Sequence, residues 1–363
     1  MTNLVSLGTS VLRKTDRRRV QAPDARTPRA TTTPNNPPAS TVRTAISGKE
    51  AYQALCEIEP SIPLFSRGWW LDAAAGPDNW DVSVVWDEGE IVAAMPYYMK
   101  RHLGMRLIVH PPLTQTMGPW FRHLPACGMK RLSEQKKLMN ALMEQLPAHD
   151  YFEQRWHYSQ TNWLPFYWAG YQQTTRYTYI LNDISDPDFV CAQFQHGKRQ
   201  DLRKAEKNLR VEFGIPARTF YDHHVMSLRQ RNTRILYSWD VFLRIYEQGH
   251  ARQASCALGA FDSHNRMHAA LFIVWDESSA YGLINTLDQQ YKTSGAATLL
   301  VREVIRYLSG RTRRFDFEGS MNPAVEASVR QFNSTQTPYF AVWKCPSRLY
   351  AFMRFLKSLK QQG

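Results

Sequence analysis

The stretch YGLINTLDQQYKTSGAATLLVREVIRYL, residues 281–308, decides the fold of this chain. Residues 281–287 form an apolar, strand-like run, and residues 298–308 place apolar side chains at helical spacing. Between them lies 292–297, Lys-Thr-Ser-Gly-Ala-Ala, whose small residues let a ligand approach the backbone closely. The free amides of a helix start bind phosphate, and the helix dipole favours negative charge there. The stretch therefore predicts a strand, an anion-binding loop and a helix.

Charge around this loop supports an anionic ligand. Lys292 and Arg302 are cationic, and the first helical turn, 295–298, contains no carboxylate. However, Ser or Thr ahead of Gly and Ala is also an ordinary helix cap. On these residues alone, both interpretations stay open.

The flanking sequence predicts alternating strands and helices. Before the loop we expect a hairpin, and after it a strand, a helix and a closing strand. The first half of the chain shows a comparable order of hairpin, helix, aromatic segment and strand. This order indicates a duplicated α/β unit. The expected segments, from the N-terminus, are helix 49–58, strands 82–86 and 91–98, helix 133–146, strand 177–181, helices 189–208, 221–231 and 239–247, strands 257–261, 269–275 and 281–287, helix 298–308, strand 314–317, helix 324–332, strand 339–343 and helix 347–360.

Bulk properties restrict the class of protein. The net charge is +13, and residues 1–49 carry nine basic and two acidic residues, a net of +7, which leaves 13 − 7 = +6 for the rest. Residues 20–48 are rich in Pro, Thr, Ala and Arg, a composition typical of disorder. The five cysteines are scattered and indicate reduced thiols, not a disulfide framework or a zinc site. We expect no metal, and a cytoplasmic location with attachment to a membrane surface as a second option.

The pattern Lys292-x-x-Gly295-x-Ala297 resembles the loop that cradles the CoA pyrophosphate in GNAT-superfamily acyltransferases. More narrowly, the chain is similar to duplicated GNAT proteins related to the Fem peptidyltransferases, found in polysaccharide and cell-envelope gene clusters. The resemblance spans roughly residues 50–345 and rests on the Gly295 loop together with three other segments, which are 63–71, 203–205 and 316–319.

The resemblance implies an α/β fold of tandem GNAT-like (acyl-CoA N-acyltransferase) domains, with mixed sheets flanked by helices. We expect a disordered basic leader at 1–48, an acceptor-side domain at 49–185, a domain with the acyl-CoA site at 186–346, and a basic amphipathic helix at 347–363. The first half lacks a Gly-x-Ala helix start, and we assign the Pro-rich 110–120 to that position. One acyl-CoA site, in the second half, is therefore expected.

The resemblance also implies roles for single residues. Direct transfer from acetyl-CoA or another acyl-CoA needs a base for the acceptor amine and an acid for the thiolate. The candidate base is Glu318, with Asp316 second, and Tyr339 or Tyr291 is the candidate acid. The acyl-CoA-binding candidates are Lys292, Thr293, Ser294, Gly295, Ala296 and Ala297. The substrate-binding candidates are Trp69, Trp70, Arg203, Lys204 and Asn285.

Three functional hypotheses remain at this point. The first is an acyl-CoA-dependent N-acyltransferase acting on an amino sugar or another envelope precursor, including an anionic or lipid-linked acceptor at a membrane surface. The second keeps the fold and changes the donor to aminoacyl-tRNA. The third, from another class, is a non-catalytic nucleic-acid-binding protein, motivated by a pI of about 9.6 and the many aromatic residues.

Overall fold

The structure, a computed structural model, describes residues 47–125, 127–319 and 321–362, with side chains described to residue 357. The predicted disordered leader thus lies outside the described residues, except for Ser47 and Gly48. Helix α1 (Gly48–Ile58) begins one residue earlier than predicted because the hydroxyl of Ser47 accepts the Glu50 amide. The Glu50 carboxylate in turn accepts the Ser47 amide, which completes a capping box.

The strands of the described residues form one continuous sheet, in the order β1-β2-β3-β5-β12-β6-β11-β10-β9-β8-β7, with β4 paired to β2. Their bounds are β1 Trp80–Asp87, β2 Glu90–His102, β3 Met105–Val109, β4 Trp120–Phe121, β5 Tyr151–Arg155, β6 Gln172–Leu181, β7 Arg210–Phe213, β8 Ser255–Phe261, β9 Met267–Trp275, β10 Ser279–Leu287, β11 Arg314–Asp316 and β12 Thr335–Lys344.

The remaining helices cover both faces of this sheet. The α-helices are α2 Gly68–Ala75, α3 Gly128–Glu144, α4 Leu164–Trp168, α5 Pro187–Ala192, α6 His196–Asn208, α7 Ala217–Arg229, α8 Trp239–Ala251, α9 Ala296–Leu308, α10 Pro323–Val329 and α11 Arg348–Gln362. Four short 3₁₀ turns are η1 Leu64–Ser66, η2 Pro77–Asn79, η3 Gln289–Tyr291 and η4 Arg330–Phe332.

The topology confirms the predicted duplication. In the second half, β10 and β11 are parallel neighbours joined by α9. In the first half, β3 and β5 are parallel neighbours joined by α3. Parallel neighbours require a crossover connection, and a helix supplies it in both cases. The repeat is therefore a hairpin, a crossover helix and a further strand.

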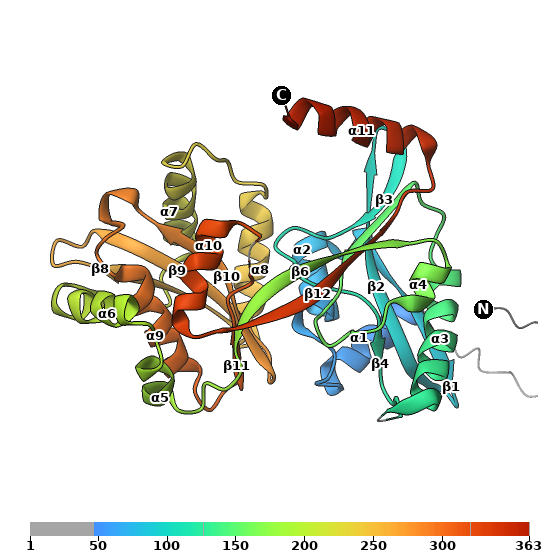
Figure 1. The fold of residues 1–363 in the computed structure, drawn as a ribbon, viewed down its shortest axis with the longest axis horizontal. Coiled ribbons are helices and arrows are strands. Elements are labelled where there is room, and N and C mark those ends of the chain that lie inside the picture. Colours follow the sequence, from blue (N-terminus) through green and yellow to red (C-terminus); the bar gives the residue numbers. More distant parts are fainter. Residues whose placement is uncertain (1–46, 126, 320, 363) are drawn as a thin grey trace, which may run out of the picture. The chain divides into compact units, whose positions relative to one another are not determined.

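The closing strand of each half lies beside the other half. β6, which ends the first half, pairs with β11, whereas β12, which ends the second half, pairs with β5. The two closing strands also pair with each other along nine positions, from Thr335 opposite Ile180 to Trp343 opposite Gln172. Figure 1 shows β6 and β12 running side by side between the two groups of strands. The halves proposed at 49–185 and 186–346 consequently share one sheet.

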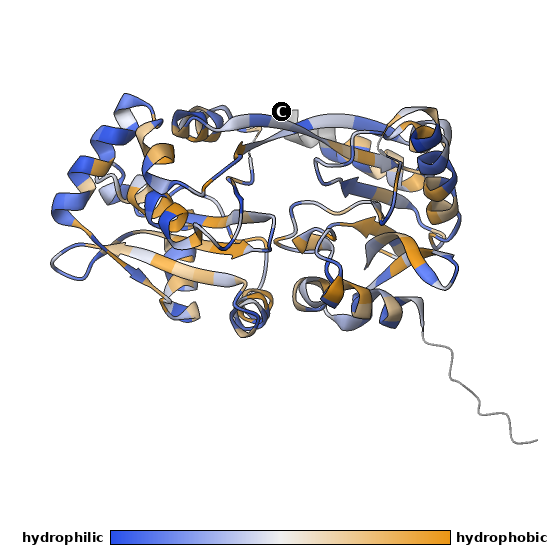
Figure 2. Cartoon of the chain, turned by 90° about the horizontal axis from the view of Figure 1, so that it is seen from below, coloured by the Kyte–Doolittle hydropathy of each residue, from blue (hydrophilic) through white to orange (hydrophobic). Residues whose placement is uncertain are grey.

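Two apolar cores cover the faces of the second half. One unites α7 and α8 with α1 and α2 of the first half, and Phe65, Phe242 and Tyr281 lie at its centre. The other packs α5, α6 and α9 on the opposite face, where Val304 and Ile305 are fully buried. Figure 2 shows apolar residues gathered on the strands and hydrophilic residues on the outlying helices. The first core therefore holds the two halves together.

Sequence patterns missed or misplaced several features of the first half. Strands β3 and β5, which were not predicted, supply its parallel pair. The counterpart of the α9 start is Gly128, with φ of 81°, and not the Pro-rich segment 110–120. The predicted C-terminal helix, α11, packs on the first half, where Tyr350 and Met353 lie against the cluster of Met105, Leu107 and Tyr151. The reason is that β12 lies beside β5, so the helix that follows it is delivered to that half.

Candidate active site

The parallel strands β10 and β11 pair only along their first three residues. Ser279, Ala280 and Tyr281 pair with the three residues of β11, and beyond Tyr281 no pairing with β11 continues. At the same point the register between β10 and β9 shifts, which leaves Gly282 and Leu283 outside the regular pairing. We call this break in strand pairing the gap, and backbone amides left outside the ladder there can serve a ligand. Asn285, exposed on the same strand, donates to the Gly282 carbonyl at 3.4 Å.

Asp316 ends β11 beside this gap and is 1 % exposed. Its Oδ1 accepts hydrogen bonds from the Thr178 hydroxyl and, at 2.7 Å, from the Glu318 amide. Burial raises the pKa of Asp316 to about 7, although both hydrogen bonds oppose that shift. A carboxylate with such a pKa can accept or release a proton near neutral pH.

Glu318 lies in the turn that follows β11. Its φ is 57°, in the left-handed region that non-glycine residues rarely adopt. The next residue, Gly319, lies so close to β6 that a Cβ there would be 2.3 Å from the Tyr177 carbonyl oxygen. Burial and the charge of Asp316 raise the pKa of Glu318 well above its ordinary value, and Arg155 opposes the rise. The strained turn thus holds a second carboxyl group with high proton affinity beside the first.

Arg155 brings a cation from the first half to the carboxyl group of Glu318. Its guanidinium donates to the Thr114 carbonyl at 3.2 Å, and its main-chain amide donates to His110 Nε2 at 2.6 Å. His110 Nδ1 lies 3.2 Å from the same Thr114 carbonyl, which assigns the proton to Nδ1. Burial lowers the pKa of His110 well below its ordinary value, so the ring stays neutral. His110 therefore fixes the backbone that carries Arg155.

Several buried polar atoms around this centre have no partner among the described residues. They are Asp316 Oδ2, Glu318 Oε1, Tyr281 Oη and Arg176 Nε. Buried polar groups in native proteins are almost always satisfied, and exceptions mark bound water, ions, ligands or catalytic groups. We use "buried polar centre" below for Arg155, Asp316 and Glu318 with these atoms around them.

The predicted acid Tyr339 belongs to the same centre. It lies on β12 opposite Arg176, is 5 % exposed, and interacts electrostatically with Arg155. Tyr291, the alternative acid, lies elsewhere and stacks on His268 at 3.9 Å between ring centroids. The structure thus places Tyr339 with Asp316 and Glu318 around Arg155, and it places Tyr291 away from them, stacked on His268. Sequence reasoning missed Arg155 and Thr178, because neither lies in a motif.

The loop 292–297 begins α9 as predicted. Gly295 caps the helix with φ of 81°, and the amide of Ala296 is held by Ser294 Oγ at 3.3 Å. The amides of Ala297 and Thr298 lie in the first helical turn, where intrahelical acceptors are lacking. No acceptor contacts them within the described residues. Ala297 is exposed, whereas Thr298 is buried.

The packing of α6 gives Gly295 a structural role as well. A Cβ at Gly295 would lie 2.2 Å from the carbonyl oxygen of Asp201 in α6. α6 also brings a cation, because Lys204 Nζ donates to the Thr293 carbonyl at 2.6 Å. The structure therefore unites the predicted Lys204 with the predicted loop, next to the exposed Lys292.

Other predicted cations and aromatic residues lie elsewhere. Arg302, expected to add charge near the loop, pairs with Glu206 and Glu303. Arg203 is exposed on the far part of α6, where it lines a shallow hollow with Cys191. Trp70 is fully buried, and its indole N–H donates to Thr114 Oγ1 at 2.9 Å.

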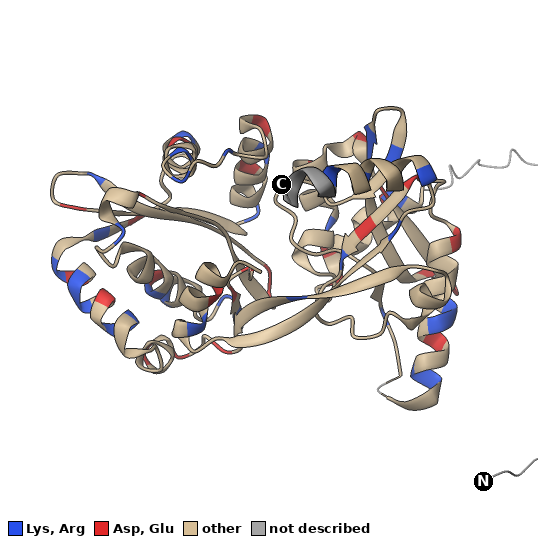
Figure 3. Cartoon of the chain, turned by 45° about the horizontal axis from the view of Figure 1, so that its top comes forward, with Lys and Arg blue, Asp and Glu red and all other residues tan. Residues whose placement is uncertain are grey.

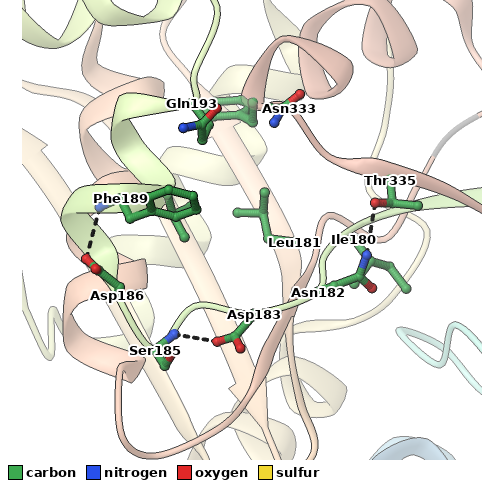
Figure 4. Close-up of a pocket in the computed structure, with 12 residues that line it drawn as sticks. Ile180, Leu181, Asn182, Asp183, Ser185, Asp186, Phe189, Gln193, Asn333 and Thr335 are labelled. Atoms are coloured by element: carbon green, nitrogen blue, oxygen red, sulfur yellow. Dashed lines mark hydrogen bonds between the residues drawn. The ribbon is translucent and has the colours of Figure 1, made fainter.

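Trp69 lines a pocket of about 320 Å³ where the two halves meet, and the Arg252 guanidinium lies 5.4 Å from the centre of its ring. A further pocket of about 300 Å³ lies between α5 and the neighbouring ends of β6 and β12. Figure 4 shows Phe189 and Leu181 on its wall, with Asp186 and Asn333 at its edge. Neither pocket includes the carboxyl groups of Asp316 and Glu318.

No protein-family model and no curated protein matches this sequence. Among solved structures, FemX has a TM-score of 0.60 at 11 % identity, covering 81 % of this chain and 96 % of FemX. The chain has a tandem GNAT-like fold. A tandem GNAT protein from the clavulanic acid biosynthesis pathway has a TM-score of 0.43 at 11 % identity, covering 76 % of this chain and 93 % of that chain. A conserved protein of unknown function from Bacteroides thetaiotaomicron has a TM-score of 0.48 at 10 % identity, covering 80 % and 97 %.

The FemX comparison confirms the predicted fold class. At 11 % identity, this similarity shows the fold alone. The gap between β10 and β11, the start of α9, Asp316 and Glu318 belong to the second half. Arg155 and Arg176 of the buried polar centre, and Thr178, which donates to Asp316, come from the first half. The tandem arrangement therefore completes one site from both halves.

Proposed function

We propose that this chain is an acyltransferase that moves an acyl group from a CoA thioester to an amine of an amino sugar or another cell-envelope precursor. The observation that carries the proposal is the pair of adjacent carboxyl groups, Asp316 and Glu318, beside the point where β10 and β11 separate. Acyl transfer to an amine requires a proton acceptor at the reacting nitrogen, and these groups combine burial with high proton affinity.

Other residues of this chain can bind the phosphates of the donor and stabilise the negative charge that develops on its carbonyl oxygen. The unpaired amides of Ala297 and Thr298, with Lys292 and Lys204 nearby, fit the phosphates of CoA. One carboxylate lies close to them, because Asp201 Oδ2 accepts from the Thr298 hydroxyl at 3.5 Å. When bound, acyl-CoA supplies the activated carbonyl carbon. The irregular backbone at Gly282 and Leu283 offers amide donors for the negative charge that develops on the carbonyl oxygen.

Protons balance across the transfer. The amine forms the new C–N bond, the C–S bond breaks, and the nitrogen gives its proton to the carboxylate of Glu318 or, through it, to Asp316. The CoA thiolate takes up one proton, for which Tyr339 is the candidate donor. The positive charge of Arg155 favours the carboxylate form of Glu318 and so opposes the rise in the pKa of that group.

Binding of acyl-CoA tests the proposal directly. Isothermal titration calorimetry should show acetyl-CoA or a longer acyl-CoA binding to the full chain and to Ala297→Gln. In Ala297→Glu the new carboxylate favours the helix start but repels phosphate, so the fold should persist and binding should weaken at least about tenfold. If no acyl-CoA binds, the proposal fails. Transfer from charged tRNA in that case would instead establish the aminoacyl-tRNA donor.

A further inference from the structure

Helix α11 has two faces of different character. One face packs on the protein, where Tyr350 lies 5.2 Å from Tyr151 between ring centroids and Met353 contacts the same cluster. The other face carries Leu349, Phe352 and Leu356, which recur with the spacing i, i+3 and i+7 and are 64 %, 58 % and 43 % exposed. Apolar side chains in this arrangement form a continuous stripe directed away from the body.

Another exposed apolar residue, outside α11, lies beside this helix. Leu103, 71 % exposed, forms the turn between β2 and β3, and the next residue but one, Met105, packs in the cluster that holds α11. Figures 1 and 3 both show α11 lying across the end of this hairpin. The stripe of α11 and the hairpin turn together form what we call the α11 surface.

Cations surround the α11 surface. The cations among the described residues are Lys100, Arg101, Arg106, Arg348, Arg354 and Lys357. Of these, Arg354 lies over the rings of Tyr151 and Trp343, on the packed side of α11. Figure 3 shows basic residues on α11 and on the strands beneath it. Acidic residues lie in the same region, and two of them, Asp78 and Asp81, line one pocket with Lys100 and Arg101. Asp150 accepts the Arg106 amide at 2.8 Å, and Glu153 accepts the Tyr151 hydroxyl at 2.5 Å. The surface is therefore apolar at its centre and cationic at its rim.

The positive charge of the α11 surface restricts which partner could cover it. Residues 347–363 contain four Lys or Arg and no Asp or Glu, so two copies of α11 would repel each other. The leader, residues 1–46, has eight basic and two acidic residues, so the cations of the α11 surface would repel it as well. An amphipathic helix with Phe and Leu on one face and Lys and Arg beside them is suited to the interface of an anionic bilayer. No helix of the described residues is long and apolar enough to cross a membrane.

We propose that the α11 surface docks on an anionic lipid membrane, with Leu349, Phe352 and Leu356 inserted among the acyl chains and the cations at the headgroups. The helix would lie in the membrane plane, next to the hairpin turn at Leu103. This inference is independent of the proposed acyltransferase activity, because none of its residues belongs to the buried polar centre.

Vesicle co-sedimentation of the full chain tests the proposal. We expect binding to vesicles of phosphatidylcholine with phosphatidylglycerol and much weaker binding to phosphatidylcholine alone. The variant Leu349→Ser/Phe352→Ser should partition at least about tenfold more weakly, because two inserted side chains are lost. The matched control Phe189→Ser removes an exposed aromatic residue from α5 and should bind as the wild type does.

A charge series separates the α11 surface from the basic leader. Arg348→Gln/Lys357→Gln should weaken binding by about tenfold or more, since each cation near an anionic surface contributes. The control Lys207→Gln/Arg313→Gln removes the same charge from exposed positions elsewhere and should change binding less than about twofold. Vesicles should also slow hydrogen exchange across residues 348–357.

Three outcomes would overturn the proposal. Equal vesicle binding by the wild type and Leu349→Ser/Phe352→Ser would assign all binding to the leader. A wild-type dimer that becomes monomeric in this variant, measured by light scattering, would make the surface a contact between copies. Binding that ignores lipid charge would exclude an anionic membrane as the partner.

Discussion

The main-chain amide of Glu318 donates a 2.7 Å hydrogen bond to Asp316 Oδ1, so the two carboxyl-bearing residues are held together by the backbone of one turn. Gly319 locks this turn against β6, because its Cα has no room for a side chain beside Thr178. The spacing of the two acids is therefore set by strand pairing and not by their own charges.

Glu318→Gln should reduce the rate of acyl transfer by about 10²–10⁴-fold, the usual contribution of a positioned general base. Binding of the acyl donor should stay within about twofold, since Glu318 is not at the start of α9. Steady-state kinetics with separate donor titrations measures both quantities. A variant that retains full kcat would exclude Glu318 as the proton acceptor.

Asp316 should make the stability of the protein depend on pH. Its pKa is raised from 3.8 to about 7 in the fold, so the folded state binds the proton more tightly than the unfolded state does. This contribution is fully present below about pH 4 and is lost as the pH rises through about 7. The expected size is of the order of a few kcal/mol.

Chemical denaturation between about pH 4 and about pH 8 measures this loss, with Asp316→Asn as the comparison. The variant removes the titrating group but can still accept the Thr178 and Glu318 hydrogen bonds, so its stability should vary less over that range. Identical pH dependence in the two proteins would contradict the raised pKa.

Gly295→Ala should destabilise the fold by about 2–5 kcal/mol, because it combines a left-handed backbone with overpacking. The added Cβ would meet the backbone of Asp201 at 2.2 Å, which a side-chain rotation cannot relieve. Thermal unfolding of the variant checks this. Gly214→Ala is a useful control, since it has a similar φ of 72° but nothing within 4 Å of the added Cβ. Equal losses in both would show that packing against α6 is unimportant.

Separating the halves should prevent each from folding. Without β12 the edge of β5 is exposed, and without β6 the edge of β11 is exposed, so unpaired strands would promote aggregation. We expect fragments 47–185 and 186–363 to be insoluble alone and soluble when expressed together, as measured by gel filtration. Cooperative unfolding of either fragment alone would refute this dependence.

Periodicity alone determined most helices and the β8–β9–β10 part of the sheet, because their apolar residues repeat at helical or strand spacing. The α9 start was also predictable, since a glycine between a strand and a strongly amphipathic helix is a local signal. Strands β3 and β5 were missed because each is only five residues long.

What the sequence determined by itself was the tandem α/β plan, the loop 292–297 and the two acids at the end of β11. These are local features, encoded by residues that are neighbours in the chain. Only the tertiary structure decided that β6 and β12 lie beside the opposite halves and that Arg155 faces Glu318 from across the sheet. It also decided that Gly295 makes room for α6. Such contacts join residues more than ninety positions apart, and the pairing energy that selects them exists only once the whole sheet has formed.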